Sequence, residues 1–135
     1  PNHLAVDHPW TESMPDCFVR GSREDMKRDP AFGPIMMFGM GGIFVELFKD
    51  VSFRIAPLTY GDAEDMLRET RAFQLLSGWR GGTEYDTDAV IDVLLRMSAL
   101  AVDFPRIQEI EINPLAVSEK GRGALCLDCR MILEA

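Results

Sequence analysis

The chain has 135 residues, of which 47% are hydrophobic and 27% charged, so its composition is that of a globular protein and excludes a disordered or fibrous one. With 14 Lys and Arg residues against 22 Asp and Glu residues, its formal net charge is −8, which argues against nucleic acid or an anionic membrane as the main partner. No apolar run approaches the roughly 18 residues that span a bilayer, and no signal-peptide pattern opens the sequence. We expect a single cytoplasmic domain that needs no disulfide support.

The first part of the chain has no apolar period of either 2 or 3.6, and four prolines fall among its first 30 residues. We therefore expect residues 1–26 to be an irregular or truncated lead-in. A short buried strand is predicted over residues 35–38, before a second apolar segment at 43–48. The alternation in residues 51–57 predicts another strand, which Pro57 ends. Its apolar side chains fall on one face, namely Val51, Phe53 and Ile55.

Two helices are predicted in the middle of the chain. Asp62 is the candidate N-cap of the first helix, whose apolar spacing continues to Phe73. The second begins near Asp86 or Thr87 and runs to about Val102. Its buried face is expected to contain Val90, Leu94, Met97 and Ala101.

The last part of the chain predicts a β-hairpin, with a first strand over residues 107–117, a polar loop at 118–123 and a returning strand over 124–132. Strands at both ends of the sequence with two helices between them indicate the α+β class.

The hairpin carries the strongest candidate site. A period of two places Glu111 and Asn113 on the face opposite Ile110 and Ile112. If the hairpin closes with Val117 opposite Ala124, then Asn113 lies across from Asp128, and Asp128 shares a face with Cys126 and Arg130.

Two carboxylates held about 4 Å apart repel by roughly 4 kcal/mol at an effective dielectric near 20, unless a cation lies between them. An all-oxygen set of ligands favours Mg²⁺ or Mn²⁺ over zinc. The spacing also fits a solvated sheet face, on which Asn113 and Pro114 only begin a turn. The residues by themselves leave both interpretations open.

Three weaker candidates lie elsewhere. The glycines of the segment 39–42 would let backbone N–H groups approach a phosphate or CoA, or would form a simple tight turn. Arg54 would bind a phosphate or form a surface salt bridge. Cys126 and Cys129 face opposite sides of a regular strand, which favours small buried side chains over a metal site.

Four stretches of the sequence together resemble a known family. They are KRDPAFGP at 27–34, MFGMGGIFVE at 37–46, KDVSFRIAPL at 49–58 and EINPL at 111–115. In this order they are similar to the ATP-grasp subunit or domain of the NDP-forming acyl-CoA synthetases, which include acetate–CoA ligase (ADP-forming). The β subunit of succinyl-CoA synthetase is a more distant relative. The resemblance covers about Lys27 to Leu133.

The resemblance implies that residues 27–135 form the C-terminal lobe of an ATP-grasp fold, a mostly antiparallel sheet packed by two main helices. ATP or ADP and Mg²⁺ or Mn²⁺ would bind between this lobe and an N-terminal one. Asn113 and Asp128 match metal-ligand positions, and Glu111 matches the acidic residue beside them, where the family more often has Asp. The resemblance also implies a nucleotide- or phosphohistidine-facing lining made of Gly39, Gly41, Gly42, Glu46 and Arg54.

The family reaction converts acyl-CoA, phosphate and ADP reversibly to a free acid, CoA and ATP, through an acyl phosphate and a phosphohistidine. The expected partners are an N-terminal ATP-grasp lobe and a CoA-binding or phosphohistidine domain or subunit, through which CoA and a small carboxylic acid bind. Since these parts are absent from the sequence, the resemblance implies that the chain alone is inactive. Two alternatives stay open: a synthetase-like regulatory module of a bacterial protein acetyltransferase, and a non-catalytic structural domain.

Overall fold

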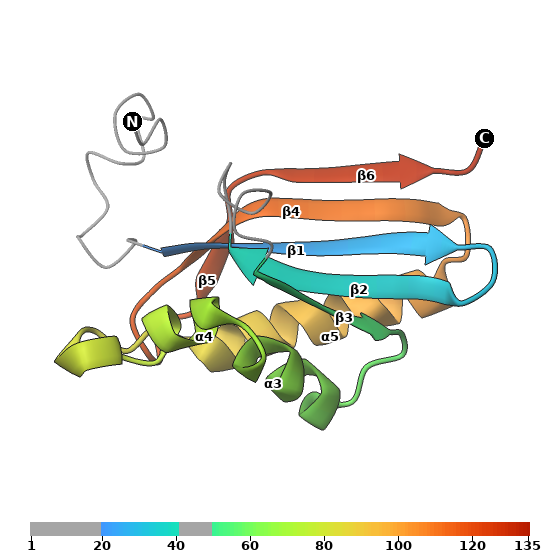
Figure 1. The fold of residues 1–135 in the computed structure, drawn as a ribbon. Coiled ribbons are helices and arrows are strands. Elements are labelled where there is room, and N and C mark those ends of the chain that lie inside the picture. Colours follow the sequence, from blue (N-terminus) through green and yellow to red (C-terminus); the bar gives the residue numbers. More distant parts are fainter. Residues whose placement is uncertain (1–19, 41–49) are drawn as a thin grey trace.

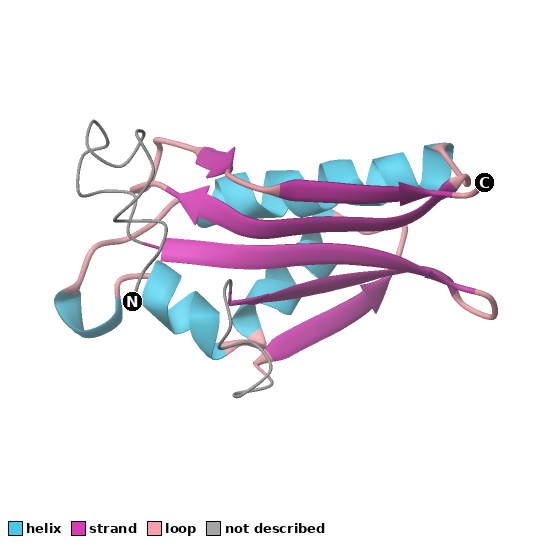
Figure 2. Ribbon diagram, turned by 90° about the horizontal axis from the view of Figure 1, so that it is seen from above, coloured by secondary structure: helices cyan, strands magenta, loops and turns pink. Residues whose placement is uncertain are grey.

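The computed structural model describes residues 20–40 and 50–135. They form an antiparallel sheet with all of the described helices on one face (Figure 1; Figure 2). The strands are β1 (Arg20–Asp29), β2 (Gly33–Met40), β3 (Val51–Ile55), β4 (Ile107–Val117), β5 (Ala124–Cys126) and β6 (Cys129–Leu133). The helices are α3 (Tyr60–Arg68), α4 (Arg71–Leu76), the short 3₁₀ helix η1 (Trp79–Gly81) and α5 (Thr87–Asp103).

The order of strands across the sheet is β3-β2-β1-β4-β5, and β6 also pairs with β4. Every pairing is antiparallel, which confirms the predicted α+β class and the mostly antiparallel sheet. Within the described ranges, no helix has the length and apolar character required to cross a bilayer.

Strand β1 corrects the expectation of an irregular segment before Lys27. It is the central strand, paired with both β2 and β4, and it begins at Arg20. Its helix-covered face carries Ser22, Glu24 and Met26, all of them almost fully buried. Because two of these three side chains are polar, residues 20–26 have no apolar alternation in the sequence, although they do form a strand. Residues 1–19 lie outside the described part of the chain.

The core lies between the sheet and the helices. From the sheet it contains Met26, Met36, Phe38, Ile110 and Ile112, and α5 contributes the four residues that its spacing predicts. The predicted start of α5 is also confirmed, since Asp86 is its N-cap.

The first predicted helix differs from the structure in two ways. It begins after Thr59, with Asp62 as the third helical residue of a capping box rather than as the N-cap. It also ends at Arg68, because Thr70 starts the separate helix α4 by accepting a hydrogen bond from the backbone N–H of Phe73.

None of the helices in residues 20–40 and 50–135 lies against the other face of the sheet, which we call the open face (Figure 2). The Ser52 hydroxyl donates to the Met66 carbonyl of α3 at 2.7 Å, so Ser52 points toward the helices and its neighbours on β3 point away from them. Accordingly, Phe53 and Ile55 are 55% and 53% exposed. The apolar stripe predicted on this strand therefore belongs to the open face.

Strand β4 contains one extra residue relative to β1. Ile112 is opposite Glu24, whereas Leu115 is opposite Ser22, so the pairing shifts at Asn113 and Pro114 in a β-bulge. The strand that returns from the hairpin is interrupted at the same level, since β5 ends at Cys126 and β6 starts at Cys129.

We expect Asp86→Ala to destabilise the fold by about 1–3 kcal/mol. The buried carboxylate of Asp86 accepts from the N–H of Ala89 at the start of α5 and from the N–H of Gly123 in the hairpin loop, at 3.1 and 2.7 Å. Urea unfolding measures the loss. Asp92→Ala, which removes an exposed α5 carboxylate paired with Arg96, is the control and should cost less than about 0.5 kcal/mol. Equal losses in the two variants would contradict this role of Asp86.

Candidate metal and nucleotide site

Asn113 and Asp128 lie side by side across the hairpin. The backbone N–H of Asn113 donates to the carbonyl of Asp128 at 3.0 Å, and the N–H of Leu127 donates to the carbonyl of Pro114 at 3.1 Å. The pairing of Val117 with Ala124 and of Asn113 with Asp128 is thus the one that the sequence predicts. The Asn113 side chain is half-buried and Asp128 is exposed.

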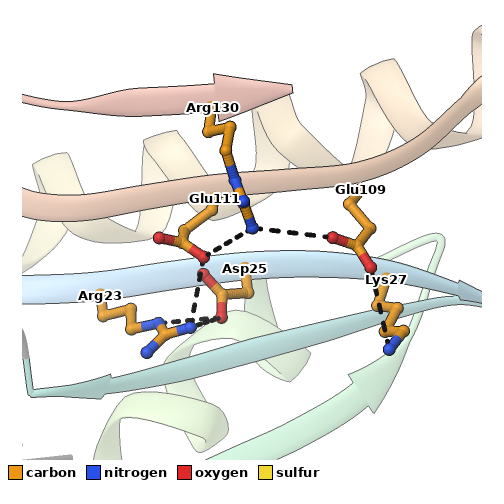
Figure 3. Close-up of polar contacts among 6 residues, drawn as sticks. All are labelled: Arg23, Asp25, Lys27, Glu109, Glu111 and Arg130. Atoms are coloured by element: carbon orange, nitrogen blue, oxygen red, sulfur yellow. Dashed lines mark hydrogen bonds and ion pairs between the residues drawn. The ribbon is translucent and has the colours of Figure 1, made fainter. Parts of the chain in front are cut away.

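Glu111 lies two residues before Asn113 on β4 and belongs to an ion-pair network on the open face (Figure 3). Its carboxylate is 3.4 Å from the Arg23 guanidinium of β1 and 3.6 Å from that of Arg130 on β6. Arg23 also pairs with Asp25 at 2.9 Å. Glu109 extends the network, with Lys27 at 3.7 Å and Arg130 at 3.9 Å.

Three carboxylates and three cations therefore alternate across β1, β4 and β6 (Figure 3). Arginine side chains offset the negative charge of Glu111, so repulsion between strand carboxylates does not by itself require a metal ion here. Burial raises the pKa of Asp25, and the hydrogen bond from Arg23 acts against this rise. Among the described residues, Asp25 Oδ1 is buried and accepts no hydrogen bond.

The donor set around the bulge fits a hard divalent cation. Asn113 offers an amide oxygen, and Asp128 and Glu111 offer carboxylates. No group of three His, Cys, Asp or Glu side chains gathers as a metal site within the described ranges. Mg²⁺ is often held by one or two carboxylates and completes its shell with water and phosphate oxygens. The pair of Asn113 and Asp128 suits that mode of binding better than a site made of protein ligands alone.

The structure does not bring Arg54 to this face. Arg54 is opposite Met36, which is buried under the helices, and its guanidinium pairs with Glu69 at the C-cap of α3. This is the salt bridge that the sequence leaves open as the alternative for Arg54. A role in phosphate binding stays a prediction.

Gly39 lies on β2 next to Val51, and a Cβ atom at this position would be 2.8 Å from Val51 Cγ1 and 3.0 Å from the Asp50 carbonyl. Close contact between β2 and β3 thus accounts for Gly39 without a ligand. The other predicted lining residues, Gly41, Gly42 and Glu46, lie outside the described residues.

Sequence reasoning missed Arg23 and Asp25, because both fall in the segment expected to be irregular. The available signal was the charge at every second position, Arg23, Asp25 and Lys27, which alternation places on one face of a strand. It also missed the buried carboxyl of Glu24. This group accepts a hydrogen bond from the Ser22 hydroxyl at 2.5 Å, and burial raises its pKa from the usual 4.5 to about 8.

The two cysteines also differ from expectation. Both are exposed free thiols. Burial of the sulfur and then the nearby Cys129 raise the pKa of Cys126. The expectations that the two side chains point to opposite sides of the sheet and are buried were wrong, because the returning strand is interrupted between them.

The fold and this site can be compared with known proteins. The sequence pattern of the ATP-grasp domain family matches residues 18–133, so the chain belongs to that family. Over 118 residues it is 52% identical to acetate–CoA ligase (ADP-forming) I of Archaeoglobus fulgidus, a match that covers 85% of this chain and 17% of that protein. Over 108 residues it is 49% identical to the β subunit of acetate–CoA ligase (ADP-forming) I of Pyrococcus furiosus, covering 80% of this chain and 46% of the subunit.

A solved structure shares the fold. It is the dinucleotide-forming acetyl-coenzyme A synthetase 1 of Ca. Korarchaeum cryptofilum, in complex with coenzyme A and Mg-AMPPCP. The TM-score is 0.80 at 44% sequence identity, over 85% of this chain and 53% of that one. The chain thus spans about half the length of this structure, and less than half of the curated relatives above.

Proposed function

We propose that the chain is the nucleotide- and Mg²⁺-binding lobe of an ADP-forming acyl-CoA synthetase. In this reaction acyl-CoA, phosphate and ADP are converted reversibly to a free acid, CoA and ATP, through an acyl phosphate and a phosphohistidine on a separate domain. The observation that carries the proposal is the backbone hydrogen bond of 3.0 Å between Asn113 and Asp128, which makes two residues with oxygen-bearing side chains neighbours across the hairpin. The similarity to ADP-forming acetate–CoA ligases supports the same conclusion.

In this proposal Asn113 and Asp128 hold Mg²⁺ or Mn²⁺, and Glu111 lies beside them in its pairs with Arg23 and Arg130. The cation, when bound, offsets the charge of the nucleotide phosphates during phosphoryl transfer. The two arginines hold the Glu111 carboxylate in place and balance its charge. This balance lowers the electrostatic repulsion between Glu111 and the phosphates of a bound nucleotide. The lining by Gly39, Gly41, Gly42, Glu46 and Arg54 remains part of the proposal on the strength of the family resemblance.

The open face supports the need for a second lobe. Beyond the charged residues of β1 and β4, its edge strand β3 presents Phe53 and Ile55, both more than half exposed. The N-terminal ATP-grasp lobe would cover this area and complete the nucleotide cleft. CoA and the carboxylic acid would bind through the CoA-binding or phosphohistidine domain. We therefore infer that the chain does not turn over alone and that it binds nucleotide weakly.

Titration with Mn²⁺ and ADP tests the proposal. We expect Asp128→Asn to weaken Mn²⁺ binding at least about tenfold, because one carboxylate ligand of a hard cation is lost. Water proton relaxation or the electron paramagnetic resonance signal of free Mn²⁺ gives the affinity. Asp103→Asn, which neutralises an exposed carboxylate at the end of α5, is the matched control and should leave binding unchanged.

If both variants bind Mn²⁺ and ADP as the wild type does, Asp128 is not part of the site. Circular dichroism of each variant verifies that the fold is retained, so that a loss of binding is not a loss of structure.

A further inference from the structure

The two cysteines of the returning strand lie on the same face of the sheet. Cys126 is opposite Leu115 and Cys129 is opposite Ile112 in the antiparallel register. Leu115 and Ile112 both belong to the core, because the bulge at Asn113 and Pro114 separates them. Residues directly opposite each other in an antiparallel pair point to the same side, so Cys126 and Cys129 share a side despite their spacing of three.

Their thiols are neighbours, since Cys129 is among the groups that raise the pKa of Cys126. The Cys126 thiol donates to the carbonyl of Asp128, the residue before Cys129, at 3.6 Å. Both residues are exposed free cysteines, which leaves them accessible to small reagents. Two neighbouring, accessible thiols on one side of the sheet are the starting arrangement that disulfide formation requires.

We propose that Cys126 and Cys129 form a reversible dithiol–disulfide pair that exchanges with low-molecular-weight disulfides of the glutathione type. In the first step a thiolate of the pair attacks the external disulfide, which forms a mixed disulfide and releases one external thiol. The second cysteine then attacks the protein sulfur of the mixed disulfide and releases the second external thiol. The pair loses two electrons and two protons, and the external disulfide is reduced to two thiols.

A redox role fits this pair better than a metal role. Structural zinc sites take four ligands, and the described residues contain no third His, Cys, Asp or Glu grouped with the two thiols. The disulfide would also leave no polar group unsatisfied, since the Asp128 carbonyl keeps the hydrogen bond from the Asn113 N–H when the thiol donor is lost.

Closure encloses Asp128 in the ring formed by residues 126–129. An effect of disulfide closure on cation binding by Asp128 is expected only if the proposed function is correct. The redox equilibrium itself is measured without metal or nucleotide. Failure of one proposal is thus distinguishable from failure of the other.

The test is the equilibrium of the chain with reduced and oxidised glutathione. Trypsin cleaves after Arg122 and Arg130, so both cysteines fall in the peptide spanning residues 123–130. After alkylation of free thiols, mass spectrometry should find this peptide two hydrogen atoms lighter than its reduced form and free of glutathione. We expect the equilibrium constant for disulfide closure to be about tenfold larger in the folded chain than in urea. This is equivalent to a reduction potential about 30 mV lower in the folded chain.

Two variants support the measurement. Cys17→Ala removes the third cysteine and should leave the closure of the pair unchanged. Cys129→Ala should convert the product to a mixed disulfide at Cys126. The proposal is overturned if the wild-type peptide accumulates as a mixed disulfide, or if the folded chain closes no more favourably than the unfolded one.

Discussion

The free energy of unfolding is expected to fall as the pH rises from about 5 to about 9, and Glu24→Gln is expected to remove most of this fall. Glu24 is 0% exposed, its Oε2 accepts no hydrogen bond in the described part of the chain, and burial raises its pKa from 4.5 to about 8. Between these two pKa values the folded chain holds a proton that the unfolded chain releases. Stability is therefore unaffected below about pH 4.5, declines as the pH rises, and reaches its full loss above about pH 8.

The pKa difference sets the size of this effect, at most about 5 kcal/mol, which is a large part of the stability of a domain of this size. Gln has nearly the shape of Glu, carries no charge and can still accept the hydrogen bond from Ser22. Above about pH 8 the variant should therefore be the more stable protein by several kcal/mol.

Urea unfolding followed by circular dichroism at several pH values measures both proteins. Glu64→Gln, which neutralises a partly exposed carboxylate of α3 paired with Arg68, is the control and should keep the wild-type slope. Asp25, whose pKa burial also raises, contributes a decline of the same sign that remains in Glu24→Gln. A wild-type slope in Glu24→Gln would show that Glu24 is not the group responsible.

Phe38→Ala is expected to cost about 3–5 kcal/mol, whereas Phe53→Ala should cost less than about 1 kcal/mol. Both phenylalanines lie on neighbouring strands of one sheet. Phe38 is 0% exposed and packs under the helices, but Phe53 is 55% exposed on the open face. Truncation of Phe38 leaves a cavity in the core, and truncation of Phe53 mainly removes a side chain from water.

Denaturant midpoints of the two variants give the comparison, with the slope of the transition checking that both remain two-state. Similar losses would mean that the open face is covered in the free chain, contrary to the one-sided packing of Figure 2. If the N-terminal lobe covers the open face as proposed, Phe53→Ala is expected to weaken that assembly.

Much of the fold could be predicted, because its signals are local. The apolar spacing of α5 and the cap at Asp86 locate that helix to within a residue at each end. The hairpin loop fixes the register of β4 with β5. Strand β1 could not be predicted, since its core-facing side chains include Ser22 and Glu24, and its place between β2 and β4 depends on contacts far apart in the sequence.

For the site, extrapolation of the hairpin register correctly paired Asn113 with Asp128. The pairing of the Glu111 carboxylate with Arg23 could not be predicted, because Arg23 lies on β1, a strand that the apolar pattern of the sequence does not reveal. The positions of Cys126 and Cys129 depend on a bulge and an interruption that a regular alternation does not contain.

The extra residue of β4 decides which side chains of this strand are inward. Before the bulge the even-numbered Ile110 and Ile112 join the core, and after it the odd-numbered Leu115 and Val117 do so. Without the bulge, regular alternation from Ile112 onward would direct Leu115 and Val117 to water, whereas deletion of one bulge residue would restore an alternation that keeps both of them inward. The bulge therefore compensates for the extra residue and keeps both halves of β4 facing the same core.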